Sequence, residues 1–179
     1  MMACVTVDDE RLRLLVAAAV EGDNAAVGEL VRCTQPMVWR VCSALGSAGE
    51  EADLVQETYL RALRSLPSYR GDSPVVPWLL AVARHVCADD VRRRQRRRRL
   101  ADRLAAHAGD AYVPGPEVVD DMLGRLDTDR REAFLLTQYV GLSYEEAASV
   151  LGCPIGTIRS RVSRAREDLA ALVRRSEAR

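Results

Sequence analysis

The chain of 179 residues contains no lysine, so its 26 strongly basic side chains are all arginine, beside two histidines. Large aromatic side chains are also scarce, with one phenylalanine, two tryptophans and five tyrosines. Hydrophobic residues still make up 48% of the sequence, and most of them are alanine, leucine and valine. Because the periodicity is helical almost throughout and no run alternates convincingly, this composition predicts an all-α protein.

Signs of several other protein classes are missing. No apolar stretch reaches the roughly 20 residues of a transmembrane helix, and acids stand near the N-terminus where a secretory signal would have bases. The five cysteines form no Cys-x-x-Cys pair, which favours neither a disulfide framework nor a zinc site. No glycine-rich phosphate loop or nucleophile–base pair is recognisable. We therefore expect a cytoplasmic protein without cofactor, metal or catalytic activity.

The net charge is zero, but the charges are unevenly distributed. Residues 92–104 carry 8 bases and 1 acid, whereas residues 1–91 carry 8 bases and 13 acids, and residues 105–179 carry 10 bases and 12 acids. A basic cluster thus lies between two acidic segments. Such a pattern is typical of a protein that contacts DNA at some places and a basic protein partner at others.

Residues 143–166 have the pattern of two short helices joined by a tight turn. Ser143 and Glu146 have the spacing of a capping box at the start of the first helix, and Gly152 is placed to end it. From Ile155 to Leu169, apolar residues recur every three or four positions and form the inner face of a second helix. Arginines occupy its outer face. This pattern predicts a helix-turn-helix that binds DNA.

The outer face of that second helix has the side chains that DNA recognition requires. Arginine can bind guanine or two phosphate oxygens through its rigid set of donors, hydroxyls can donate to phosphates, and glycine allows a close backbone approach. The alternative is an ordinary solvated basic helix. The candidate DNA contacts are Gly156, Thr157, Arg159, Ser160, Arg161, Ser163, Arg164 and Arg166.

A change in composition divides the chain. Residues 108–116 contain two prolines and two glycines and show no helical pattern, which predicts an extended linker. We expect a first domain at residues 8–98, a flexible linker at 99–116 and a second domain at 117–175. The first domain is predicted to contain four helices, the second of them kinked or broken at Pro36 and the third capped by Ser47 and Glu50.

The segment at residues 67–77 mixes an aromatic, an arginine and aliphatic side chains, which is unusual in a loop. One interpretation is that Val75 and Val76 only close the end of the helical bundle. The other is that this loop, with Tyr69 and Arg70, receives an unstacked base, because single-stranded DNA binds to apolar or aromatic platforms beside cations.

Three motifs occur in order along the chain. They are Asp53-Leu-Val-Gln-Glu-Thr-Tyr-Leu-Arg-Ala-Leu63; Tyr69-Arg-Gly-Asp-Ser73 with Trp78-Leu-Leu-Ala-Val-Ala-Arg-His85; and Arg130-Arg-Glu-Ala-Phe-Leu-Leu136 with Gly141-Leu-Ser-Tyr-Glu-Glu-Ala-Ala148 and Gly156-Thr-Ile-Arg-Ser-Arg-Val-Ser-Arg-Ala-Arg166. Together they resemble the extracytoplasmic-function (ECF) sigma factors of the sigma-70 family, over nearly the whole chain. The stretch Gly152-Cys-Pro-Ile-Gly-Thr157 also resembles the actinobacterial sigma-C type.

The first motif resembles the family's helix for binding core RNA polymerase. The resemblance implies docking on the clamp helices of the largest subunit, with the flap region as a further contact of the protein. The exposed side of this predicted helix carries acids, a glutamine and arginines at helical spacing, which suits a basic coiled coil. An ordinary solvated face is the alternative. The candidate polymerase contacts are Asp53, Gln56, Glu57, Arg61 and Arg64.

The second motif resembles the family's loop and helix that read and open the downstream (minus-ten) promoter element. The resemblance implies that arginines bind phosphates while the loop holds a flipped base. His85 stands where many relatives have asparagine, and Val75 and Val76 stand where some have aromatics, so the resemblance does not imply the base preference. The alternative for His85 is a polar residue bonded at the helix surface. The arginine run at residues 92–99 stays open between DNA contact, RNA or polymerase contact, and solvation. The candidate downstream contacts are Tyr69, Arg70, Val75, Val76, Trp78, Arg84, His85 and Arg92.

The sequence therefore predicts an alternative sigma factor with two small helical domains, called regions 2 and 4 in this family. The third motif implies binding of the upstream (minus-thirty-five) element by region 4, so that the protein reads a bipartite promoter. An anti-sigma factor is a further candidate partner. The alternative function is a stand-alone helix-turn-helix transcriptional regulator, which leaves the polar face at residues 53–64 unexplained. An enzyme is the least supported class.

Overall fold

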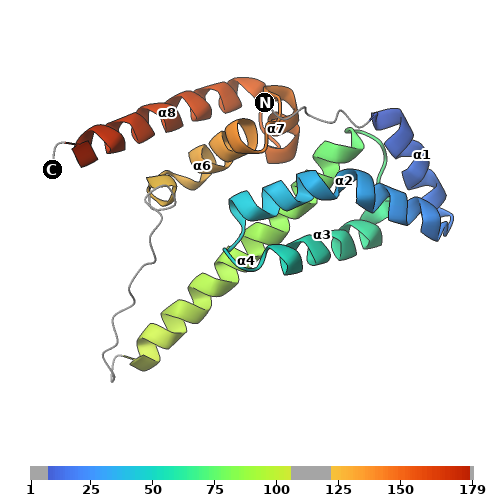
Figure 1. Ribbon diagram of the computed structural model, residues 1–179, viewed down its shortest axis with the longest axis horizontal. Helices are drawn as coiled ribbons and strands as arrows, with labels where there is room; N and C mark the ends of the chain where they lie inside the picture. The colour runs from blue at the N-terminus through green and yellow to red at the C-terminus, as the bar shows by residue number, and fades with distance from the viewer. Residues whose placement is uncertain (1–7, 106–121, 178–179) are drawn as a thin grey trace.

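The computed structural model describes the backbone of residues 8–105 and 122–177, with side chains at 8–97 and 122–175. Within these ranges all regular structure is helical, which confirms the all-α prediction. Two groups of helices follow one another along the chain (Figure 1). The first comprises α1 (Asp9–Val20), α2 (Asn24–Leu45), α3 (Glu51–Ser65), the 3-10 turn η1 (Leu66–Ser68) and α4 (Val75–Ala105). The second comprises α6 (Thr128–Phe134), the π-helical turn η2 (Leu135–Tyr139), α7 (Tyr144–Leu151) and α8 (Ile155–Glu177).

The first group is built around α4, which α2 and α3 both contact (Figure 1). Apolar side chains spaced by three or four residues put one face of each helix into a common core. A second cluster, formed by Leu12, Val16, Leu30, Leu66 and Val75, holds α1 against the bundle. Each such side chain contributes on the order of 1.5–3 kcal/mol when it leaves water. The main core residues of α2 and α4 are Val38, Val41, Cys42, Leu45, Leu79, Leu80, Ala83, Val86 and Cys87.

Two local predictions in this group need correction. Helix α2 continues through Pro36, so of the two predicted alternatives, a kink or a break, the break does not occur. The predicted capping box before α3 is also absent, because Glu50 is the N-cap residue and makes no side-chain cap bond. Ser47 has another partner: its Oγ donates to Asp90 Oδ2 at 2.7 Å. The serine thus ties the turn between α2 and α3 to α4.

Helix α4 extends to Ala105 and so includes residues 99–105, the first part of the predicted linker. The remainder of the predicted linker, residues 106–116, lies outside the described part of the chain. The boundaries at 8–98, 99–116 and 117–175 stay predictions.

The two groups of helices are packed on each other. Helix α7 contacts α4, and η2 contacts α2. Buried residues of the second group, including Leu136, Val140 and Val150, belong to the same apolar cluster as the core of α2 and α4. Two polar contacts accompany this packing: Arg84 Nε lies 2.8 Å from Glu132 Oε2, and Arg40 Nη1 donates to the carbonyl of Val140 at 3.4 Å. The expected helical groups are present, but in this conformation they share one core.

Candidate promoter and polymerase interfaces

The helix-turn-helix has the predicted local chemistry. Ser143 Oγ accepts from the Glu146 amide at 3.1 Å, and Glu146 Oε2 accepts from the Ser143 amide at 2.8 Å, which is the predicted capping box. Gly152 ends α7 with φ of 62°, a left-handed conformation that glycine adopts most easily. The turn that follows leads directly into α8.

Helix α8 presents an apolar side to α6 and α7 and a basic side to solvent. Ile158, Val162 and Ala165 are almost fully buried, as the periodicity predicts. Among its arginines, Arg159 and Arg164 are exposed and have no ion-pair partner within the described residues. They can bind an external anion without giving up an internal bond.

The other two arginines of this face are tied to the protein. Arg161 pairs with Asp129 at the start of α6, and its Nη1 lies 3.7 Å from Cys153 Sγ. Arg166 Nη2 donates to Gln138 Oε1 at 2.8 Å. These bonds position both side chains and must be shared or exchanged before either contacts DNA.

The two serine hydroxyl groups on this face are also bonded internally. Ser160 Oγ donates to the Thr157 carbonyl at 2.9 Å, and Ser163 Oγ donates to Glu167 at 3.2 Å. Gly156 is exposed near the start of α8, with open space around its Cα. The structure thus brings the predicted upstream contacts onto one helix, with two arginines fully available.

The loop before α4 forms a small cavity of about 230 Å³, lined by Ser68, Tyr69, Arg70, Asp72, Ser73 and Trp78. The rings of Tyr69 and Trp78 lie 5.0 Å apart, centre to centre, with their planes tilted by 49°. The Tyr69 hydroxyl donates to the Ser73 carbonyl at 2.5 Å, and burial of the ring raises the pKa of this hydroxyl. Two rings, one exposed arginine and fixed hydroxyls therefore border one hollow.

Val75 does not line this cavity. It is the first residue of α4, fully buried, and it packs in the cluster with Leu12 and Leu66. Its amide donates to Asp9 Oδ1 at 2.7 Å, which fixes the start of the helix to α1. Val76 is partly buried against both apolar clusters. Val75 therefore fits the first interpretation, a residue that closes the bundle, and it cannot contact a base in this conformation.

The polar residues farther along α4 are in different environments. Arg84 is turned to the second group of helices through its ion pair with Glu132. His85 is exposed, and its Nδ1 lies 2.7 Å from the Ala81 carbonyl. Arg92 is paired with Asp89 at 2.8 Å and has 63% of its side chain exposed. Of these three, Arg84 has to leave its partner before it reaches DNA.

The predicted polymerase contacts all lie on one side of α3. Asp53, Gln56 and Arg64 are exposed, whereas the opposite side of the helix is buried. Arg61 is held by two acids, with Nε 2.7 Å from Glu57 and Nη1 2.7 Å from Asp89 of α4. These hydrogen bonds, first that of Asp89 and then that of Glu57, raise the pKa of Arg61. The Asp89 carboxyl responds in the opposite sense: Arg61 and then Arg92 lower its pKa to about 2.

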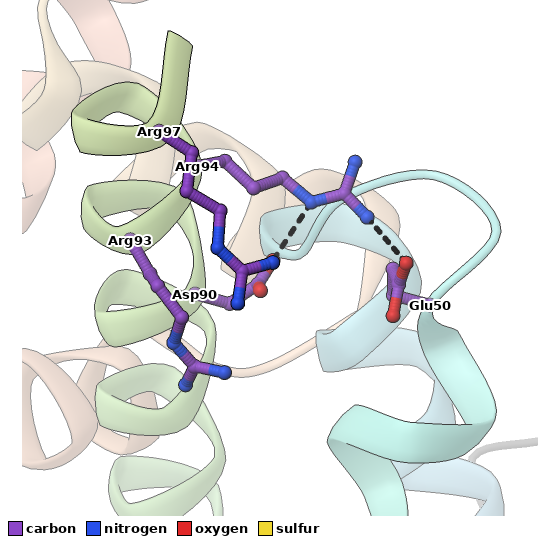
Figure 2. A pocket seen from close by; sticks show the side chains of 5 residues that line it. All are labelled: Glu50, Asp90, Arg93, Arg94 and Arg97. Carbon is purple, nitrogen blue, oxygen red and sulfur yellow. Dashed lines mark ion pairs between the residues drawn. The ribbon is translucent and has the colours of Figure 1, made fainter. Parts of the chain in front are cut away.

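The arginine run is divided between two sides of α4. Arg92 and Gln95 face the cleft beside α6, whereas Arg93, Arg94 and Arg97 extend toward the start of α3 (Figure 2). The sequence pattern alone, taken as one arginine run, does not place Arg93 and Arg97 near the acids of α3. The helical period was the signal that could have separated them, because 86, 90, 93 and 97 fall on one stripe.

No group of three or more His, Cys, Asp or Glu residues in the described part of the chain is arranged to hold a metal ion. None of the helices at residues 8–105 and 122–177 is long and apolar enough to cross a membrane.

Comparison with known protein families agrees with this geometry. Residues 30–97 match the model for sigma-70 region 2, and residues 117–169 match that for sigma-70 region 4. The chain is 44% identical over 176 residues to the probable RNA polymerase sigma-C factor of Mycobacterium bovis, covering 95% of each chain. The chain belongs to the ECF sigma factors. Its predicted membership of the family is thereby confirmed. The identity to the sigma-C factor, 44%, supports the predicted resemblance to the sigma-C type.

Similar sigma factors occur in several other bacteria. The chain is 34% identical over 172 residues to the sigma-E factor of Escherichia coli, which covers 87% of this chain and 90% of that one. Among solved structures, CnrH in complex with the cytosolic domain of CnrY is similar with a TM-score of 0.70 and 32% identity, over 93% of this chain and 97% of CnrH. RpoE of Bartonella quintana, in complex with the anti-sigma factor NepR, has a TM-score of 0.61 and 30% identity, over 82% and 95%.

The family establishes the general function. The protein is an alternative sigma factor, which associates with RNA polymerase and directs transcription initiation at promoters. Region 2 spans most of α2, α3 and α4, and region 4 contains α6, α7 and most of α8. Helix α1 precedes the region 2 match and contributes Leu12 and Val16 to the core.

Proposed function

We propose that this sigma factor reads a bipartite promoter with two separate surfaces and docks on core polymerase with a third. The outer side of α8 binds the upstream element. The cavity at Tyr69 and Trp78, with the polar side of α4, binds the downstream element and helps to open it. The exposed side of α3 binds the polymerase. The proposal keeps the two-domain division at residues 8–98 and 117–175.

The observation that carries the proposal is the state of the arginines on α8. Arg159 and Arg164 are exposed and unpaired within the described residues, on a helix whose other side is fixed in a core. A guanidinium presented by a rigid helix suits the major groove, where arginine binds the O6 and N7 atoms of guanine. The paired residues Arg161 and Arg166 are better placed to position the helix on phosphates.

The cavity before α4 supports the downstream role. A flipped base needs a flat apolar surface and polar groups at its edges. Tyr69 and Trp78 provide the rings, and Ser68, Arg70 and Ser73 provide donors and acceptors around them. Val75 is fully buried and is not part of this surface.

Docking through α3 follows from its charges. Asp53 and Glu57 lie on the exposed side, with Gln56 between them and Arg64 farther along the helix. The clamp helices of the largest subunit remain the counterpart that the family resemblance implies, with the flap region as a second contact. Charge pairs in such an interface set orientation and encounter rate more than affinity.

The packed arrangement must change for both promoter surfaces to work together. Arg84, a proposed downstream contact, is paired with Glu132 of α6, and apolar residues of α7 and η2 are buried against α2 and α4. Reading two separated elements requires the two groups to move apart. That movement exposes apolar surface of both groups to water, and contacts with polymerase would offset the free energy that this exposure costs.

We also propose that the protein acts in the cytoplasm and by binding alone, since its partners are polymerase and promoter DNA. An anti-sigma factor is a candidate inhibitor, because the similar sigma factor RpoE of Bartonella quintana forms a complex with the anti-sigma factor NepR. Co-purification of a separate protein that blocks polymerase binding would support this part, and free access of polymerase in cell extracts would contradict it.

Reconstitution tests the main proposal. Purified bacterial core polymerase with this protein should start transcripts at defined promoters, and Asp53→Arg with Glu57→Arg should abolish this by weakening polymerase binding. The same double variant should leave DNA binding by the α8 surface intact. Activity only in the presence of another sigma factor would instead indicate a stand-alone regulator.

A further inference from the structure

Two shallow grooves meet at Arg93, between the start of α3 and the later part of α4. One groove of about 400 Å³ is lined by Glu50, Asp90, Arg93, Arg94 and Arg97 (Figure 2). Its neighbour of about 330 Å³ is lined by Glu50, Asp53, Leu54, Glu57, Val86, Asp90 and Arg93. Arg93 thus lies beside Asp53 and Glu57, which belong to the proposed polymerase face.

The three arginines of the first groove differ in their bonding. Arg94 lies between two acids, with Nη2 2.7 Å from Glu50 Oε1 and Nε 3.6 Å from Asp90 Oδ2. Arg93 and Arg97 extend into the same groove, are exposed, and have no ion-pair partner among the described residues (Figure 2). Arg94 is therefore bonded to the local acids, whereas the guanidinium groups of Arg93 and Arg97, two residues one helical turn apart, stay available.

The surroundings of these guanidinium groups favour a protein ligand over DNA. A duplex carries one negative charge per roughly 1.7 Å of its axis. A backbone laid along Arg93 and Arg97 would bring further phosphates close to Glu50, Asp53 and Glu57, where like charges repel. A protein surface can place carboxylates opposite the arginines and basic groups opposite the acids. The mixed charge of the grooves matches such a surface.

We infer that Arg93 and Arg97 belong to the surface that docks on core polymerase. The docking surface then has an acidic half on α3 and a basic half on α4, and its counterpart on the polymerase carries carboxylates next to basic groups. This inference rests on the proposed docking through α3. It assigns part of the arginine run to polymerase contact, whereas Arg92, on the side toward α6, remains a proposed DNA contact.

Charge reversal in the full chain tests the inference. Arg93→Glu with Arg97→Glu should weaken binding to purified core polymerase by about tenfold or more at low salt, because both attractions become repulsions. Arg96→Glu is the matched control: Arg96 is exposed on the same helix but lines neither groove, and its change should stay within about twofold. Arg93→Lys with Arg97→Lys keeps the charge and should retain most of the affinity. The three variants and the unmodified protein should all unfold at the same temperature.

The outcomes separate this inference from the proposed docking itself. Unchanged polymerase affinity in the Arg93→Glu, Arg97→Glu variant overturns the inference, and so does an equal loss with Arg96→Glu, which would indicate a general charge effect. Normal polymerase affinity with weakened promoter binding by the holoenzyme would assign the arginines to DNA. If Asp53→Arg with Glu57→Arg binds normally, the proposed α3 face fails whatever the arginines do.

Discussion

Arg84 of α4 and Glu132 of α6 form an ion pair, with 2.8 Å between Nε and Oε2, that joins region 2 to region 4. Their side chains are 25% and 14% exposed, so the pair is largely shielded from water. Arg84 is also a proposed downstream promoter contact. The same side chain therefore stabilises the packed arrangement and, in the proposed function, contacts DNA only after that arrangement has opened.

Removal of Glu132 should destabilise the free protein. Glu132→Ala leaves the Arg84 charge half-buried without its partner, which should lower the free energy of unfolding by ~1–3 kcal/mol. Urea unfolding measures this change. Glu145→Ala, at an exposed position of α7, is the control and should alter stability by less than ~0.5 kcal/mol. Equal midpoints for the two variants would mean that the pair contributes nothing.

Arg159 should determine recognition of the upstream element. Arg159→Ala removes a fully available guanidinium and should weaken binding to the preferred sequence by ~1–3 kcal/mol, with less selectivity among sequences, if the side chain contacts a base. Titration of holoenzyme against promoter variants measures both effects. Arg174→Ala, farther along α8, is the matched control. A uniform loss across all sequences would reduce Arg159 to a phosphate contact.

Val75 and Arg70 should behave oppositely. Val75→Ala removes two buried methyl groups and should lower the free energy of unfolding by about 2 kcal/mol, because the surrounding core cannot fully fill the space that these groups leave. Arg70→Ala changes an exposed side chain at the Tyr69 cavity and should leave stability nearly unchanged while it slows promoter opening. Urea unfolding and a fluorescent-base opening assay separate the two. If Val75→Ala were as stable as the unmodified protein but opened the promoter poorly, Val75 would have to be counted among the DNA contacts.

Acid should weaken the link between α3 and α4. The folded pKa of Asp89 is about 2, below the roughly 3.9 of an unfolded aspartate. Its stabilising effect is thus complete above about pH 4 and is lost as pH falls toward 2. Asp89→Asn should therefore cost stability at neutral pH, by less than ~1 kcal/mol because the side chain is 41% exposed. The difference in free energy of unfolding between this variant and the unmodified protein, measured with urea, should shrink below pH 4. A difference that stays constant with pH would mean that the charge of Asp89 is not its cause.

Local features were predictable from the sequence where the determinants lie close together along the chain. The capping box at Ser143 and Glu146, the end of α7 at Gly152 and the inner side of α8 all follow from spacing within one helix. The Ser47 prediction was wrong because its hydroxyl is used by Asp90, 43 residues away. No local pattern indicates such a partner.

On the candidate surfaces, too, the sequence predicts what depends on nearby residues and misses what depends on distant ones. Helical spacing places the α3 and α8 contacts on exposed sides, as we expected. It does not show that Arg61 is bound by Asp89, that Arg161 is bound by Asp129, or that Val75 is buried beneath α1. Those facts depend on contacts between helices that are far apart in the sequence.

The central claim is that this protein directs core polymerase to promoters with two sequence elements. Sequencing of the transcripts made in vitro by the reconstituted holoenzyme on genomic DNA tests it most directly. The account predicts start sites that share two upstream sequence blocks at a fixed spacing, with only the farther block losing its influence in the Arg159→Ala holoenzyme. Start sites without shared upstream sequences, or no transcripts beyond those of core polymerase alone, would contradict it.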